Sequence, residues 1–352
     1  MAKKGMMNNP TGLEKTLSEL PANTIIFDSF VKANSLVTSG KFKRIVVSVS
    51  GGSDSDLIVD LFTKLTTNVE YVFFDTGIEY QASKDHLDYL EHKYGIEIKR
   101  IRAKVPVPSA CIKKGQPFIS KPVSEFISRL QRNNFKWVDK PYEELIQEYP
   151  KCSSALKWWC NDKGRGMDTS FFNINRNKYL KEFLIDNPPT FKISNKCCDL
   201  AKKDTAHQFI HPEDLDVVGV RKAEGGARIR YNSCTSLSKE ENTYRPIFWY
   251  TQADKTDYEA FADIKHSRCY TEYGLKRTGC AGCPFGRDFE FELEVLEKYE
   301  PQLYKAACNI FKKSYEYTRK YREYKKQREK EDKVLRVGYQ NTIFDYLSEK
   351  EG

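Results

Sequence analysis

Apolar and polar positions alternate in blocks over the first third of the chain, and these blocks predict strands and helices in turn. A β-branched run at 46–49 precedes apolar residues at helical spacing between 57 and 65. A second apolar run at 69–74 and a third at 96–101 enclose another helical pattern. Strands that alternate with helices are typical of βαβ units on a parallel sheet. We therefore expect an α/β fold, a Rossmann-like twisted parallel sheet flanked by helices.

The remaining patterns suggest a division of the chain. We expect an N-terminal segment at 1–40, a main domain at 41–290, and a helical C-terminal extension at 291–352. A proline cluster and the loss of a clean period mark a helical insertion in the main domain at about 106–190. The other expected elements are helices at 25–36, 123–130 and 254–264, a strand at 215–220 and an edge strand at 246–250.

A loop rich in glycine and serine follows the first expected strand. It reads Ser50-Gly51-Gly52-Ser53-Asp54-Ser55 and leads directly into a helical pattern. The glycines let the backbone approach a ligand closely, the hydroxyls add donors, and the new helix offers free N–H groups. Such a corner binds phosphate or pyrophosphate. It is not a Walker loop, because no Gly-Lys-Ser/Thr follows at the required spacing.

A second candidate site lies at the end of the next strand, where Asp75, Thr76 and Gly77 follow the run at 69–74. Ligands of parallel sheets lie at the carboxyl ends of strands. We therefore expect both loops to face one nucleotide.

Composition favours a protein without membrane spans and with anionic partners. Charged residues make up 30% of the chain, the net charge is +9, and no apolar run is long enough to cross a bilayer. Met1-Ala2-Lys3-Lys4 is not typical of a signal peptide, so we expect a cytoplasmic protein. Lys and Arg interleave with tyrosines at 312–333, a pattern that suits either a solvated helix or a surface for single-stranded nucleic acid.

Ten cysteines in a reducing compartment point to metal ligands or reactive thiols. Cys197 and Cys198 are adjacent, and Cys280 and Cys283 have the Cys-x-x-Cys spacing that lets two sulfurs reach one metal. Four thiolates suit an iron–sulfur cluster or structural zinc. A redox dithiol of Cys280 and Cys283 is a third interpretation. The other cysteines have no assigned role, although two of them, Cys234 and Cys269, are substitute ligands: Cys111, Cys152, Cys160, Cys234, Cys269 and Cys308.

Two arginines follow the expected strand at 215–220. Arg221 comes directly after Gly219-Val220, and Arg228 lies a few residues further on. A guanidinium is a planar, permanently charged fork that binds sulfate or phosphate oxygens. The pair is therefore a candidate binding site for a dianion.

The loop at 50–55 resembles the PP-loop, Ser-Gly-Gly-x-Asp-Ser, of the ATP pyrophosphatase superfamily. Together with Asp75-Thr76-Gly77 and the Gly-x-Arg segment at 219–221, it makes the chain resemble the phosphoadenosine phosphosulfate (PAPS) reductase family over roughly 41–105 and 195–290. The tandem and Cys-x-x-Cys cysteines are similar to the [4Fe–4S] ligands of bacterial adenylylsulfate (APS) reductases.

The resemblance implies a role for each of these residues. Residues 50–55 would cradle the phosphates of ATP, PAPS or APS, and Asp54 would help to hold Mg²⁺. Asp75 and Thr76 would lie near the ribose or adenine, and Arg221 and Arg228 would receive the acceptor's anionic group.

The sulfonucleotide reductases attack sulfur with a cysteine in a Glu-Cys-Gly-x-His segment, and Glu-Cys-Gly does not occur in this sequence. The phosphate loop is complete, as in true ATP pyrophosphatases. We therefore expect ATP cleavage to AMP and pyrophosphate, which activates a nucleic-acid or small-molecule acceptor for sulfur transfer, with a sulfur-donor protein as a fitting partner. The alternatives are a sulfonucleotide reductase whose nucleophile is Cys308 or Cys234, and a non-catalytic nucleotide-binding protein.

Overall fold

The computed structural model describes residues 10–161, 173–286 and 288–348, and the chain forms two compact units. The first unit combines Met1–Val107, Asp199–Ala281 and Glu292–Leu303. The second unit combines Pro108–Cys198, Gly282–Phe291 and Tyr304–Gly352. The second unit therefore contains most of the expected insertion together with most of the expected C-terminal extension. Each unit has an apolar core of its own.

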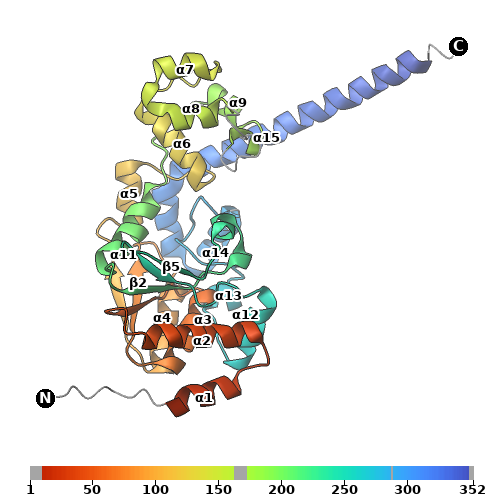
Figure 1. Ribbon diagram of the computed structural model, residues 1–352. Coiled ribbons are helices and arrows are strands. Elements are labelled where there is room, and N and C mark those ends of the chain that lie inside the picture. The colour runs from red at the N-terminus through yellow and green to blue at the C-terminus, as the bar shows by residue number, and fades with distance from the viewer. Residues whose placement is uncertain (1–9, 162–172, 287, 349–352) are drawn as a thin grey trace. The chain divides into compact units, whose positions relative to one another are not determined.

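A six-stranded sheet forms the centre of the first unit (Figure 1). Its strands are β1 (Ile45–Ser48), β2 (Glu70–Asp75), β3 (Ile98–Arg102), β4 (Leu215–Val218), β5 (Thr235–Leu237) and β6 (Asn242–Tyr244). The order is β3-β2-β1-β4-β6-β5, and every neighbouring pair is parallel except β5 with β6. The predicted α/β fold with a parallel sheet is therefore confirmed.

Helices α2, α3, α4 and α12 gather on one side of this sheet (Figure 1). The helices of the first unit are α1 (Pro10–Glu19), α2 (Thr24–Thr38), α3 (Ser53–Leu65), α4 (Gln81–Tyr94), α11 (Asp204–Phe209), α12 (Gln252–Phe261) and α13 (Arg268–Thr271), while α14 (Phe289–Tyr299) belongs to both units.

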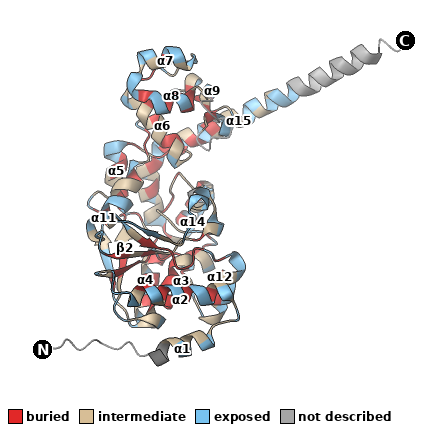
Figure 2. Cartoon of the chain, viewed as in Figure 1, coloured by how far each residue is buried: buried red, intermediate tan, exposed pale blue. Residues whose placement is uncertain are grey.

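The strand β2 shows how the sheet separates its two faces. Tyr71 and Phe73 belong to the core beneath α2 and α3, and Figure 2 shows this part of the strand as buried. Phe74 points the other way because successive side chains of a strand alternate, and its ring lies 6.2 Å from that of Phe209 in α11. The continuous apolar run that predicted this strand therefore reflects burial on both faces.

The chain leaves β1 toward β2 on one side and returns through β4 on the other. Ser48 pairs with Val218, so β1 and β4 end side by side. Such a reversal of strand order leaves a crevice at the carboxyl ends, where open α/β sheets bind ligands. The loop of residues 50–55, called the serine–glycine loop below, begins here, and so does the loop that carries Arg221.

The expected edge strand at 246–250 is wrong. This segment is a turn, in which the Phe248 amide donates to the Arg245 carbonyl at 3.2 Å and the Tyr250 amide donates to Ile247 at 3.1 Å. The strand lies just before it, at Asn242–Tyr244. Pro246 has no amide hydrogen for a ladder, and the turn buries Ile247, Phe248 and Tyr250 while Trp249 stays 47% exposed.

The second unit is helical in its described part. It contains α6 (Lys121–Arg132), α7 (Tyr142–Glu148), α8 (Ser153–Trp159), α9 (Leu180–Asp186), α10 (Lys196–Cys198), most of α5 (Val107–Lys114) and most of α15 (Pro301–Ser348). Tyr317 and Tyr321 of α15 pack their rings against Phe118 and Phe183. These tyrosines belong to the core of the unit, which favours the solvated helix over a base-stacking surface. No helix in the described ranges has the length and apolarity needed to cross a membrane.

Candidate functional site

The serine–glycine loop turns sharply between β1 and α3. Gly51 has φ +67°, a conformation that favours glycine. A Cβ on Gly52 would lie 3.1 Å from both Ser50 Oγ and Thr278 Oγ1, so a side chain here would require these hydroxyls to move. The Ser55 hydroxyl donates to the Gly52 carbonyl at 2.7 Å and closes the first turn of α3.

A second glycine brings the loop after β4 against this turn. A Cβ on Gly219 would lie 2.9 Å from the Asp54 carbonyl oxygen, so only glycine allows such a close approach. Arg221 follows two residues later and is thereby placed beside the Asp54 side chain. The local geometry thus explains why glycine and arginine occur at this spacing.

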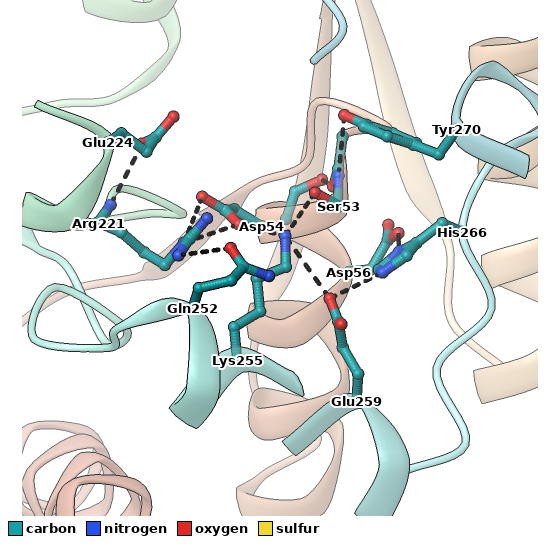
Figure 3. A network of polar contacts seen from close by, with 12 residues as sticks. Ser53, Asp54, Asp56, Arg221, Glu224, Gln252, Lys255, Glu259, His266 and Tyr270 are labelled. Atoms are coloured by element: carbon teal, nitrogen blue, oxygen red, sulfur yellow. Dashed lines mark hydrogen bonds and ion pairs between the residues drawn. The ribbon is translucent and has the colours of Figure 1, made fainter. Parts of the chain in front are cut away.

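Asp54 lies between two cations, as Figure 3 shows. Arg221 Nε donates to both Asp54 carboxylate oxygens at 3.0 Å. Lys255 Nζ donates to Asp54 Oδ1 at 2.7 Å and to Ser53 Oγ at 2.6 Å. The side chains of all three charged residues are at most 15% exposed, so little solvent screens these ion pairs.

A chain of histidines and carboxylates runs beside this triad. Glu259 Oε1 lies 3.5 Å from Lys255 Nζ and 2.8 Å from His266 Nε2. His266 Nδ1 lies 2.7 Å from Asp56 Oδ2, and His86 Nε2 lies 3.0 Å from the other oxygen of Asp56. All of these residues belong to the first unit.

Two opposing effects set the charge of this chain. Burial lowers the pKa of His266, but its hydrogen bonds to Asp56 and Glu259 outweigh burial and raise the pKa to about 9. Burial raises the pKa of Asp56, but the hydrogen bonds to His266 and His86 hold it below its ordinary value. His266 is therefore an imidazolium at neutral pH and Asp56 is a carboxylate.

These loops surround a pocket of about 390 Å³. Its arginine and lysine lining residues are Arg221, Arg228, Lys255, Lys276 and Arg277, and its carboxylates are Asp54, Glu224 and Glu259. Ser50, Gly52, Ser53, Gly219, Gln252, His266, Tyr270 and Thr278 complete the lining. Arg228 Nε lies 3.0 Å from Glu224 Oε2. The excess of cations, together with the N-terminus of α3, suits a polyanionic ligand.

Six of the site residues expected from the sequence line this pocket, namely Ser50, Gly52, Ser53, Asp54, Arg221 and Arg228. Asp75, Thr76 and Gly77 are not among the described lining residues. The Asp75 side chain accepts the Gly77 amide at 2.8 Å, and the Thr76 hydroxyl donates to Glu79 at 2.5 Å. Their expected place near the ribose or adenine stays a prediction.

The four expected cysteine ligands fall in different units. Cys280 belongs to the first unit, where its sulfur lies 3.6 Å from Thr76 Oγ1. Cys197, Cys198 and Cys283 belong to the second unit. There, a hydrogen bond with Cys111 raises the pKa of the Cys197 thiol, while one with Cys198 acts in the opposite direction. Within the described ranges, no group of three or more His, Cys, Asp or Glu side chains is arranged to bind a metal ion.

The sequence analysis missed several lining residues, most of them on α12 and the segment after it: Gln252, Lys255, Glu259, His266, Tyr270, Lys276, Arg277 and Thr278. One signal for Lys255 was available. In a helix, Lys255 shares a face with Tyr258, which lies three residues later, and these two are the buried residues of α12. A lysine on the apolar face of an amphipathic helix needs a buried partner. His266 and Tyr270 show no periodic signal.

The serine–glycine loop lies between a strand and a helix at the carboxyl edge of a parallel sheet, an arrangement typical of phosphate-binding loops in α/β domains. Residues 44–119 match the model of the phosphoadenosine phosphosulfate reductase domain. The matched stretch includes β1, the serine–glycine loop, α3, β2, α4, β3 and α5.

Other comparisons give more distant likenesses. An uncharacterized protein of Methanocaldococcus jannaschii is 23% identical over 279 residues, which are 77% of this chain and 42% of that protein. The chain therefore spans less than half the length of this relative. Two solved structures are each 14% identical to the chain: PAPS reductase from Candida auris (TM-score 0.37, 77% of this chain and 93% of that one) and NH3-dependent NAD synthetase from Campylobacter jejuni (0.33, 84% and 95%).

The U34-tRNA thiolase of Methanococcus maripaludis, solved with its [4Fe–4S] cluster, is 13% identical with a TM-score of 0.31 over 85% of this chain and 80% of that one. Structural likenesses of this size do not determine a function.

Proposed function

We propose that this protein is an enzyme that binds ATP at the serine–glycine loop and cleaves it to AMP and pyrophosphate, thereby activating an acceptor for sulfur transfer. The observation that carries the proposal is the pocket of about 390 Å³. It joins the N-terminus of α3 to five arginine and lysine side chains, with three carboxylates among its lining residues.

The proposed reaction consists of two successive displacements. An acceptor oxygen attacks the α-phosphorus of ATP, the bond to the β-phosphate oxygen breaks, and pyrophosphate leaves. A hydrosulfide from a donor then attacks the carbon that bears the adenylated oxygen and gives up its proton, the new C–S bond forms, and the original oxygen departs with AMP. The residues of this chain bind and neutralise the phosphates, since Arg221 and Arg228 offer guanidinium forks and α3 offers free N–H groups.

The contacts of Asp54 support a positioning role as an alternative to the expected role as a metal ligand. Both of its oxygens accept hydrogen bonds from Arg221, and one also accepts Lys255, so the carboxylate has little capacity left for Mg²⁺. We propose that Asp54 fixes Arg221 and Lys255, and that Mg²⁺ enters with ATP as part of the substrate. Phosphate oxygens and water are sufficient ligands for such an ion.

We further propose, from the sequence spacing, that Cys197, Cys198, Cys280 and Cys283 bind a [4Fe–4S] cluster, with zinc as the alternative. Thiols are the donors that such a cluster requires, and the thiol of Cys197 has Cys111 and Cys198 as partners. A bound cluster would supply redox or sulfur-binding chemistry. The acceptor is either a nucleic acid or a small molecule, and its activated group must be an oxygen.

The test compares two nucleotides under anaerobic conditions. The protein is incubated with ³²P-labelled MgATP and candidate acceptors, and separately with PAPS and reduced thioredoxin, and the products are separated. We expect AMP and pyrophosphate from ATP. Efficient release of sulfite from PAPS would favour a sulfonucleotide reductase instead, and ADP with phosphate would contradict the proposed cleavage. Binding of ATP with no turnover for any acceptor would favour the non-catalytic alternative.

A further inference from the structure

Lys255 lies in an unusual place for a lysine. It is on the first turns of α12, its side chain is only 6% exposed, and its Nζ reaches the first residues of α3. The start of α12 is fixed by Thr251 and Asp254, which cap each other's backbone amides. A buried lysine loses hydration, so its position requires compensating charges or a function.

The surroundings of Lys255 concentrate positive charge. The N-terminus of α3 carries the positive end of the helix dipole, and Arg221 lies on the other side of Asp54 (Figure 3). Asp54 is therefore one carboxylate shared between two cations and a helix N-terminus. A purely structural ion pair would need only one cation, whereas a binding site for several phosphate oxygens needs such an excess.

We propose that Lys255 binds the outer phosphates of the nucleotide and of pyrophosphate, supplying from α12 the lysine that the serine–glycine loop lacks. Lysine is an effective point charge for phosphate groups. Its Nζ already lies within hydrogen-bonding distance of Ser53 Oγ, at the first residue of α3, where a phosphate would meet the free helix amides. This inference rests on the proposed function and adds a binding residue to the same site.

Glu259 and His266 act as positioning residues for Lys255. Glu259 is one helical turn from Lys255, but its Oε1 is closer to His266 Nε2 (2.8 Å) than to Lys255 Nζ (3.5 Å). The positive charge of His266 therefore draws Glu259 away from a tight pair with the lysine. Lys255 stays directed toward Ser53 and Asp54, which take two of its three N–H donors and leave the third for an incoming phosphate.

The test measures the affinities of the whole protein for MgATP, pyrophosphate and AMP by titration calorimetry. Lys255→Met keeps the length of the side chain and removes its charge. We expect it to weaken binding of pyrophosphate and MgATP by about 10- to 100-fold, as expected for a lost charge-assisted hydrogen bond. AMP should lose far less affinity because it lacks the outer phosphates. Lys255→Arg should restore part of the pyrophosphate affinity, and the exposed Lys32→Met should change nothing.

A second pair of variants covers the case in which Lys255→Met does not fold. The first variant, Asp54→Asn, removes the carboxylate charge. The second, Asp54→Asn/Lys255→Met, also removes the ammonium charge, so it leaves no unpaired carboxylate at residue 54. We expect the double variant to bind pyrophosphate at least tenfold more weakly than Asp54→Asn does. The assignment of Lys255 would be overturned if the double variant bound pyrophosphate as tightly as Asp54→Asn does. It would also be overturned if folded Lys255→Met bound pyrophosphate as tightly as the unmodified protein does.

The two proposals fail in different measurements. The wrong cleavage products from ATP would contradict the proposed function and leave phosphate binding by Lys255 standing. An unmodified protein that binds MgATP and pyrophosphate, with variants that bind them equally well, would contradict only the role of Lys255. An unmodified protein that binds neither ligand would contradict both.

Discussion

Arg221 donates from a single nitrogen, Nε, to both carboxylate oxygens of Asp54, at 3.0 Å each. The terminal nitrogens of its guanidinium therefore remain directed elsewhere, and Nη1 lies 3.5 Å from Gln252 Oε1. The contact joins the loop after β4 to the first turn of α3. It fixes the arginine while leaving part of its donor fork for a ligand in the pocket.

A double-mutant cycle of Asp54→Asn and Arg221→Met should show strong coupling. Both side chains are at most 15% exposed, so we expect a coupling free energy of unfolding of about 1–3 kcal/mol in urea denaturation. The pair Arg228 and Glu224 is the matched control, because it has a similar distance of 3.0 Å but side chains 36% and 29% exposed. That cycle should give about 0–1 kcal/mol. Similar coupling free energies in the two cycles would contradict the expectation that burial strengthens the Asp54–Arg221 ion pair.

Gly52→Val should weaken nucleotide binding while preserving the fold. A Cβ at this position would lie 3.1 Å from two hydroxyl oxygens and 3.3 Å from Tyr270 OH, inside the space that the loop leaves around the helix N-terminus. We expect MgATP affinity to fall by at least about tenfold, which corresponds to 1.4 kcal/mol.

Gly279→Ala is the control for this variant, because a Cβ there has no heavy atom within 4 Å and Gly279 is outside the described pocket lining. Calorimetry with unchanged affinity in folded Gly52→Val would refute the placement of the phosphates.

The serine–glycine loop could be predicted because its chemistry is local. Strand, turn and helix signals from Val46 to Leu65 are contiguous, and each determines its own backbone conformation. The loop after β4 could be predicted for the same reason, since Gly219 and Arg221 directly follow the strand. The failure at 246–250 has a local cause as well, because apolar side chains buried by a turn imitate a strand.

The other half of the pocket could not be predicted in this way. Lys255 reaches Asp54 across 201 positions of sequence, and only the packing of α12 against α2 and α3 brings the two together. His266 lies in the irregular segment after α12, and Tyr270 lies in the short helix α13, so neither belongs to a periodic pattern. A polar residue without periodicity carries no information on its partners until the fold is known.

The proposed cluster predicts a defined iron content. Protein purified without oxygen should be brown and contain about four iron atoms per chain, as a cubane with four thiolate ligands requires. Cys197→Ser or Cys283→Ser should lose most of this iron, measured together with the visible absorbance. Cys308→Ser is the control, because Cys308 lies in α15 outside the proposed ligand set. Stoichiometric zinc without iron would replace the cluster by a structural zinc site.

Finally, His266 predicts a pH-dependent contribution to stability. The pKa of His266 is raised to about 9 in the folded protein from 6.5, so its bonds to Asp56 and Glu259 stabilise the fold fully below pH 6.5. This contribution is lost as the pH rises toward about 9.

His266→Asn should therefore lower the free energy of unfolding by about 1.5–3 kcal/mol at pH 6, the range for hydrogen bonds to charged groups. The difference from the unmodified protein should shrink steadily between pH 6.5 and 9 in urea denaturation. His92→Asn, at an exposed position of α4, should show no such trend. A difference that stays constant with pH would mean that His266 is neutral in the folded protein, and the charged link between Asp56 and Glu259 would then be wrong.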